Sequence, residues 1–224
     1  LFLDVVVYFS LILGFLVVGA LASLSPSIRR FLHRRFRVPC LPNAVNTFRH
    51  GATLGELLVT AGVASLFAFW FWYWSSSNIR VSQDVNGPET RWPRVLGHMT
   101  TLAMSLLTFP VARNSILTAA YGIPFERAVK YHRLLGRLCW VFVTIHMILW
   151  QAKWIRDGNL TLNIFTLTNL TPAPGFGHPN NFTVPLAELA WLLLAIAIIV
   201  AGALRRKSFE AFQYTHLAVL FFFL

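Results

Sequence analysis

Two histidines in one apolar stretch are the residues of this sequence best placed to bind a metal. His132 and His146 are 14 residues apart, which is close to four turns of an α-helix and about 21 Å along its axis. Both side chains therefore project from nearly the same face of one helix, at two different depths. Neutral imidazole is a common axial ligand of haem iron, so this spacing predicts two stacked haems, one in each half of a membrane.

A haem that is bound on both faces needs a ligand from a second helix, and His216 is the candidate. It follows a basic cluster that includes Lys207, which puts it at about the depth of His132. A partner for His146 is expected about 14 residues beyond His216, past Leu224. The alternative for each membrane histidine is a hydrogen bond to a neighbouring helix.

The other four histidines carry weaker signals. His98 lies near the start of an apolar stretch and is interpreted as an interfacial or packing residue, with a role near the outer haem or the substrate as the alternative. The remaining three are expected at the solvent-exposed surface: His33, His50 and His178.

Composition indicates that the elements carrying these histidines cross a membrane. Apolar residues make up 56% of the 224 residues and charged residues only 12%, whereas soluble domains are near half apolar and a quarter charged. The apolar residues form blocks of about 20, the length of a helix that crosses a bilayer. Aromatic residues gather at block ends, as in residues 69–74, which is typical of the membrane interface.

The predicted fold is an all-α polytopic transmembrane helical bundle with six spans, the last of them truncated. A start without Met and an end inside an apolar stretch indicate a fragment of a longer protein. The spans are expected at residues 2–21, 54–74, 95–111, 131–150, 184–204 and 212–224.

Basic residues in the loops predict the orientation of the chain. Fourteen of the 19 Lys and Arg residues fall on one side of the predicted spans, and the more basic side is expected to be cytosolic. This bias explains the net charge of +11 without nucleic-acid binding. Three sequons in the loop at residues 151–183, on the predicted outer side, support the same orientation because glycosylation requires the secretory lumen: Asn159, Asn169 and Asn181.

Three segments resemble the haem-carrying membrane domain of the ferric reductase and NADPH oxidase superfamily. Residues 131–138, Tyr-His-Arg-Leu-Leu-Gly-Arg-Leu, continue to His146 and are similar to a ligand-bearing core helix of fungal ferric reductases. Residues 209–216 resemble the start of the second ligand-bearing helix, and residues 121–127 the loop before the first. The resemblance covers about residues 95–224.

The resemblance implies roles for individual residues. His132 and His216 would bind the iron of the cytosol-side haem b, and His146 would be one ligand of the outer haem b. Phe222 matches an aromatic residue between the two haems of relatives; the alternative is an ordinary lipid-facing or core Phe. Three arginines are candidates to pair with propionates of the inner haem, although positive-inside topology explains them equally: Arg133, Arg137 and Arg205.

The resemblance also implies a domain organisation. Residues 1–22 would be an extra N-terminal transmembrane helix, residues 23–53 a basic cytosolic loop, and residues 54–224 a ferric-reductase-like haem-binding domain that is incomplete at its C-terminus. The last core helix and the FAD-binding and NADPH-binding domains would follow Leu224. The sequence has no Gly-rich dinucleotide fingerprint, so this chain alone is not expected to accept electrons from NADPH.

The implied function is transmembrane electron transfer. Electrons from cytosolic NADPH would pass through FAD and the two haems to a ferric or cupric chelate outside, in the plasma membrane or the vacuolar membrane, with iron-uptake proteins as candidate partners. Because paired histidines leave no open position on the iron, the acceptor would be reduced at the haem edge or through an outer pocket. No catalytic side chain is expected. The alternatives are an NADPH oxidase that makes superoxide, a cytochrome b561-like dihaem protein, and a transporter or channel whose histidines relay protons.

Overall fold

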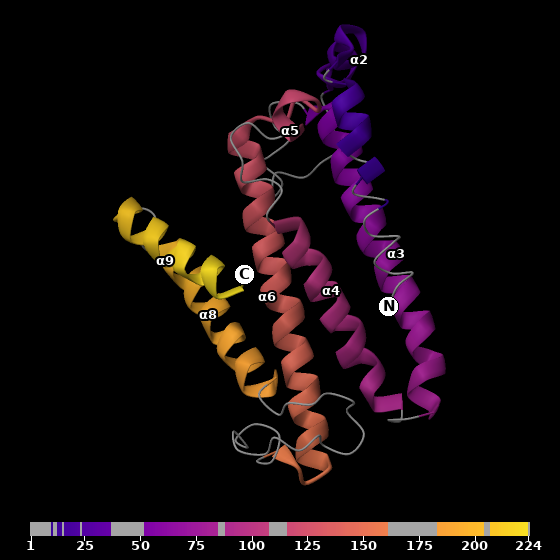
Figure 1. Ribbon diagram of the computed structural model, residues 1–224, viewed down its shortest axis with the longest axis vertical. Helices are drawn as coiled ribbons and strands as arrows, with labels where there is room; N and C mark the ends of the chain where they lie inside the picture. Colours follow the sequence, from indigo (N-terminus) through magenta and orange to yellow (C-terminus); the bar gives the residue numbers. More distant parts are fainter. Residues whose placement is uncertain are drawn as a thin grey trace. The chain divides into compact units, whose positions relative to one another are not determined.

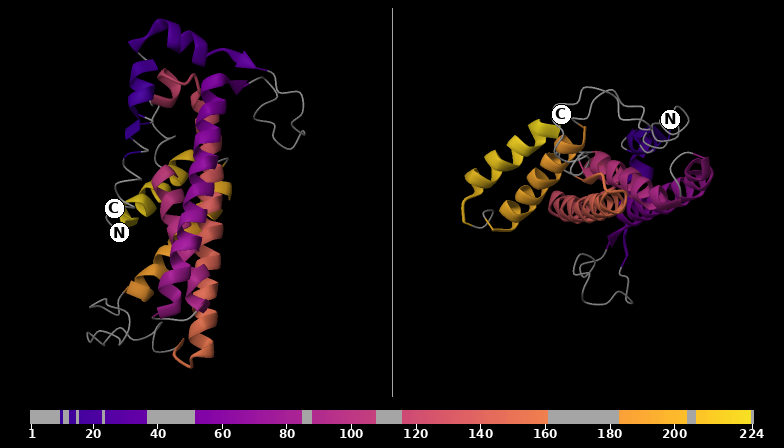
Figure 2. Two further views of the ribbon diagram at one scale, coloured as in Figure 1. Left: turned by 90° about the vertical axis from the view of Figure 1, so that its right-hand side faces the viewer. Right: turned by 90° about the horizontal axis from the view of Figure 1, so that it is seen from below.

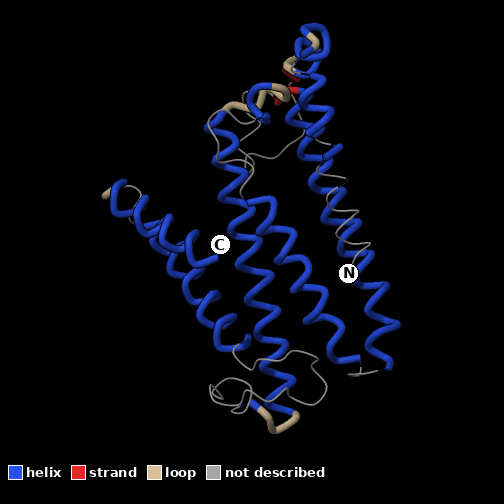
Figure 3. Tube along the Cα trace, viewed as in Figure 1, coloured by secondary structure: helices blue, strands red, loops and turns tan. Residues whose placement is uncertain are grey.

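The computed structural model describes residues 10, 13–14, 16–22, 24–36, 52–84, 88–107, 116–160, 183–203 and 207–223. These residues are almost entirely helical (Figures 1 and 3). The elements are α2 (Pro26–Leu32), β1 (Arg35–Phe36), β2 (Ala52–Thr53), α3 (Leu54–Asp84), the 3-10 helix η2 (Pro88–Thr90), α4 (Arg91–Leu107), α5 (Ile116–Ala119), α6 (Phe125–Arg156), α8 (Thr183–Ala203) and α9 (Phe209–Phe223).

Three of the six predicted spans are confirmed as helices that are long and apolar enough to cross a membrane: Leu54–Ser77, Phe125–Arg156 and Val184–Ala203. The predicted spans at 95–111 and 212–224 overlap α4 and α9, which begin four and three residues earlier and have 17 and 15 residues. The described residues of the predicted span at 2–21 are helical, while residues 1–9, 11, 12, 15 and 108–115 lie outside the described part.

α6 is longer than the predicted span of residues 131–150, and its ends explain why. It begins directly after Pro124, whose carbonyl accepts from the N–H groups of Arg127 and Ala128. It ends where Gly158 adopts a φ of 71°, with bonds from Asn159 N–H to the Trp154 carbonyl and from Gly158 N–H to the Ile155 carbonyl. These two bonds form a Schellman motif, which satisfies the last carbonyls of a helix.

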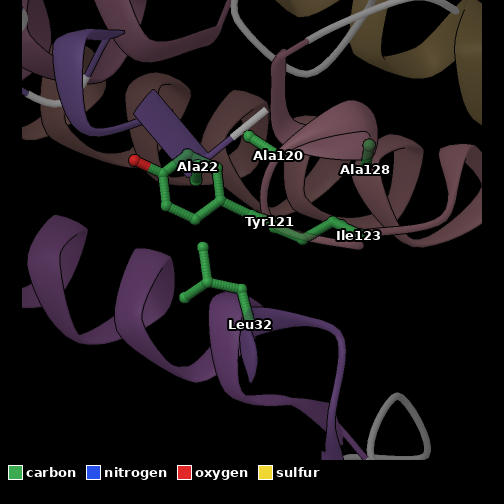
Figure 4. Close-up of a cluster of buried hydrophobic side chains, with 6 residues drawn as sticks. All are labelled: Ala22, Leu32, Ala120, Tyr121, Ile123 and Ala128. Atoms are coloured by element: carbon green, nitrogen blue, oxygen red, sulfur yellow. The ribbon is translucent and has the colours of Figure 1, made fainter. Parts of the chain in front are cut away.

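The chain divides into two compact units, Leu1–Phe69 with Ser105–Leu135 and Trp70–Met104 with Gly136–Leu224. The first unit has a small apolar core from the helix before Ser25, from α2, from the turn after α5 and from the start of α6 (Figure 4). Its buried members are Ala22, Leu32, Ala120, Tyr121, Ile123 and Ala128.

The start of α3 is fixed against the Tyr121 turn in this first unit. The Thr53 hydroxyl donates to the Tyr121 carbonyl at 3.1 Å and accepts from the Glu56 N–H at 3.0 Å. A Cβ atom on Gly55 would lie 2.2 Å from the same carbonyl oxygen, so only glycine permits this approach. β1 and β2 pair antiparallel just before α3, a two-residue ladder that the all-α prediction did not include.

In the second unit, α8 forms a hairpin with α9 (Figures 1 and 2), and two side-chain hydrogen bonds join α8 to α6. The Gln151 side chain donates to Glu188 at 2.9 Å, and the Trp191 indole donates to the Thr144 hydroxyl at 2.9 Å. Such polar contacts join helices in a medium where no water competes. The outer face of α8 exposes large apolar side chains, as expected for a surface in contact with lipid.

Candidate functional site

The two histidines of α6 are bonded to the backbone of α4 in the same way. His146 Nδ1 lies 2.5 Å from the Pro93 carbonyl oxygen in the second unit. His132 Nδ1 lies 2.8 Å from the Leu107 carbonyl oxygen in the first unit. Each histidine is half-buried. A neighbouring helix therefore does bond each of them, as the alternative interpretation of a membrane histidine expected.

These bonds fix which ring nitrogen carries the proton. A carbonyl oxygen can only accept, so Nδ1–H is the donor in both rings. In the neutral form of such a ring the lone pair is on Nε2. A metal-bound histidine usually donates its other N–H to a carbonyl or carboxylate in the same manner, which holds the ring and raises its basicity. The two bonds to α4 are therefore compatible with ligation through Nε2.

α4 and α6 run antiparallel with a repeat of seven residues between their contacts. The Cys139 thiol, midway between the two histidines, lies 3.9 Å from the Thr100 carbonyl oxygen and is fully buried. Each step of seven residues forward along α6 is thus matched by seven residues back along α4. A seven-residue repeat keeps one face of a helix against its neighbour, so the 14-residue spacing of the histidines matches the packing of these two helices.

His216 lies on α9 in the second unit, half-buried, with its ring 5.2 Å from the Phe212 ring between centroids. His132 belongs to the first unit. The pairing of His132 with His216 therefore stays a prediction. Phe222 lies in helical backbone of α9, but its side chain is outside the described part of the structure.

The predicted propionate partners differ in how much of them is described. Arg133 and Arg137 are exposed on α6, roughly 100° and 140° around the helix from His132. Arg205 lies outside the described residues, as do Asn169, Asn181, His50 and His178.

Asn159 is exposed directly after the end of α6. His98 stacks on Trp74 with ring centroids 3.3 Å apart and planes at 7°, and His33 is exposed with its ring against Gly122.

A buried ionic cluster precedes His132 and was missed by sequence reasoning. Glu56 on α3 is fully buried and forms an ion pair with Arg127 of α6. The Tyr131 hydroxyl donates to the other carboxylate oxygen at 2.9 Å, and the Thr60 hydroxyl lies 3.4 Å from the Tyr131 hydroxyl. An acidic residue in the first turn of an apolar span was the available signal, because buried charges in membranes are normally paired.

The described histidines do not gather with other metal-binding side chains into one site. Within the described part of the chain, no three His, Cys, Asp or Glu side chains gather into a group that would hold a bare metal ion. Single imidazoles at separate depths suit a metal whose other ligands come from a macrocycle, as in haem.

Comparison with known proteins gives one family and several relatives. The family model described as ferric reductase like transmembrane component matches residues 96–224. Ferric reduction oxidase 7, chloroplastic, of Arabidopsis thaliana is 30% identical over 122 residues, 54% of this chain and 15% of the relative. Ferric reductase transmembrane component 6 of Saccharomyces cerevisiae is 26% identical over 128 residues, 53% of this chain and 15% of the relative. No solved structure gives a significant match.

Proposed function

Because this chain belongs to the family of ferric reductase-like transmembrane components, we propose that it is the haem-carrying membrane part of a longer reductase. Its curated relatives are ferric reduction oxidases and a ferric reductase transmembrane component, and the match spans about 15% of each. The whole protein would move electrons from cytosolic NADPH and FAD to a ferric or cupric chelate on the other side of the membrane.

The observation that carries this proposal is the shared bonding of His132 and His146. Two histidines on one face of a membrane helix both donate Nδ1–H to a carbonyl of α4. In both rings, Nε2 is then the nitrogen that is available for iron. The hydrogen bond to a helix carbonyl, whose position is fixed by the backbone, sets the orientation of each ring. This donor set fits a haem at each of two depths about 21 Å apart along α6.

A bound haem supplies one-electron chemistry at its iron, and the chain supplies everything around it. His132 and His146 would each hold one haem through an imidazole nitrogen, with His216 as the proposed second histidine at the inner haem. The apolar side chains of α3, α6 and α8 would exclude water from the span, since each of these helices is long and apolar enough to cross a membrane. Burial and ligand hydrogen bonds tune the potential of such a site.

A proton relay through the same histidines is disfavoured by their bonding. A relay needs each ring to take a proton on one nitrogen and release it from the other. Here Nδ1 of both rings is held as a donor against a carbonyl that cannot accept its proton. The bonding of the two histidines therefore favours electron transfer over proton transport.

The proposed orientation of the chain in the membrane follows from its loops. Residues 23–53 would face the cytosol as a basic loop after an N-terminal helix at residues 1–22, and Asn159, Asn169 and Asn181 would face the secretory lumen or cell exterior. The sequons favour the plasma membrane over an organelle outside the secretory pathway. Phe222 would lie between the haems, and Arg133, Arg137 and Arg205 would be candidates for propionate contacts.

Haem counting in histidine variants tests the proposal. In the full-length protein, His132→Ala and His146→Ala are each expected to lose one of two haems, because each removes an imidazole that would hold one. The measurement is the haem content per polypeptide with the reduced-minus-oxidised optical spectrum. His98→Phe is the control, since an aromatic ring there retains stacking on Trp74, and it should keep both haems. Full haem content in His132→Ala or His146→Ala would contradict the ligand assignment.

A further inference from the structure

Gly97 on α4 lies directly against the His146 ring. A Cβ atom on Gly97 would be 2.9 Å from Cε1 and 3.1 Å from Nδ1 of His146. A separation below 3.0 Å requires something to move, and the nearest atoms all belong to the imidazole. Any side chain at this position would therefore displace the ring itself.

The position of Pro93 explains why the space above Gly97 matters. In an α-helix the carbonyl of residue 93 also accepts from the N–H of residue 97. The His146 Nδ1–H donates to this same Pro93 carbonyl at 2.5 Å. The Pro93 carbonyl already accepts a hydrogen bond within α4. The His146 imidazole can therefore reach it only by lying over Gly97, the residue one turn later in the helix. Glycine is the residue that leaves this path open.

The other contacts between α4 and α6 do not require a glycine. Thr100 faces Cys139 at 3.9 Å, and Leu107 meets His132 through the last carbonyl of α4. A glycine in a helix interior is less stable than alanine because it restricts more backbone freedom on folding. Its presence beside His146, and not at the other two contacts, thus has a local structural reason.

We propose that Gly97 is a positioning residue that sets the strength of the His146–Pro93 hydrogen bond and, through it, the reduction potential of the haem that His146 binds. This inference rests on the proposed function. A strong bond from Nδ1–H to a carbonyl makes the imidazole a better electron donor to iron, which stabilises the oxidised haem and lowers its potential. A side chain at position 97 weakens that bond.

The test is a redox titration of the full-length protein carrying Gly97→Ala, followed optically and by low-temperature electron paramagnetic resonance. The expected result is a rise in the midpoint potential of one haem, or loss of that haem, while the other keeps its wild-type potential. His146→Ala identifies the affected haem. The control is Gly62→Ala on α3, where a Cβ meets nothing within 4 Å, and both potentials should stay unchanged.

The outcomes separate the inference from the proposed function. A wild-type protein without haem overturns both. A wild type with two haems and a Gly97→Ala variant with unchanged potentials overturns the inference alone.

If Gly97→Ala does not fold, the double variant Gly97→Ala with His146→Ala decides. The double variant lacks the imidazole that a side chain at position 97 would meet. If it folds, the collision with His146 is the reason why Gly97→Ala alone does not fold. If it fails while His146→Ala folds, Gly97 serves another purpose and the inference is wrong.

Discussion

At the scale of single residues, the described histidines are placed by different contacts. His98 packs face to face on an indole, and His33 is exposed. His132 and His146 each place Nδ1 within hydrogen-bond distance of a carbonyl oxygen of α4. Residue type and spacing predicted this pair, but the carbonyl partners come from backbone, which carries no residue-specific signal in a sequence.

The Glu56 cluster gives a prediction about stability. Glu56→Gln removes the charge that balances Arg127 in a buried pair, and breaking such a pair costs about 3 kcal/mol. We expect a lower free energy of unfolding in detergent, measured by thermal or denaturant melting. Tyr131→Phe should cost less, about 1 kcal/mol, because it removes hydrogen bonds of a neutral hydroxyl and leaves the ion pair in place.

Matched variants separate the ion pair from a general effect of lost charge. Glu126→Gln removes an exposed carboxylate in the first turn of α6 and should leave stability nearly unchanged. The double variant Glu56→Leu with Arg127→Met replaces both charges by apolar groups and should recover much of the loss. Equal destabilisation by Glu56→Gln and Glu126→Gln would contradict the importance of the buried pair.

At the scale of elements, the packing of α4 against α6 determines where the imidazoles sit. Cys139 is fully buried at the middle contact, so Cys139→Phe should force α4 away from α6 by overpacking. We expect a shifted potential or loss of the haem that His146 is proposed to bind, one heptad away in the same unit. Cys139→Ser preserves the size and a donor towards the Thr100 carbonyl, and should behave like wild type. Identical haem spectra in Cys139→Phe and wild type would show that this contact does not position His146.

The helices themselves were predictable to different degrees. Hydropathy located α3, α6 and α8 because each contains an apolar stretch long enough to cross a membrane. The ends of α6 were misplaced because the polar and basic residues of its first turns lower the local hydropathy, although Pro124 and Gly158 mark its ends in the sequence. Glu56 was missed because its partners, Arg127 and Tyr131, are 71 and 75 residues away.

At the scale of the whole molecule, the proposed topology predicts which asparagines carry glycans. Asn159→Gln should remove one glycan and increase mobility on a gel, because Asn159 is exposed beyond the end of α6 on the proposed outer side. Treatment with an endoglycosidase should abolish the difference between this variant and wild type. A wild-type protein without any glycan at Asn159, Asn169 or Asn181 would contradict this support for the orientation.

The central claim is that electrons cross the membrane through the two haem sites of this chain. The most direct measurement uses full-length protein in sealed vesicles, with NADPH outside at the cytosolic face and a ferric chelate trapped inside. We predict reduction of the trapped chelate by wild type, and its loss in His146→Ala, while NADPH still reduces a soluble dye on its own side. Undiminished reduction of the trapped chelate by His146→Ala would contradict the claim.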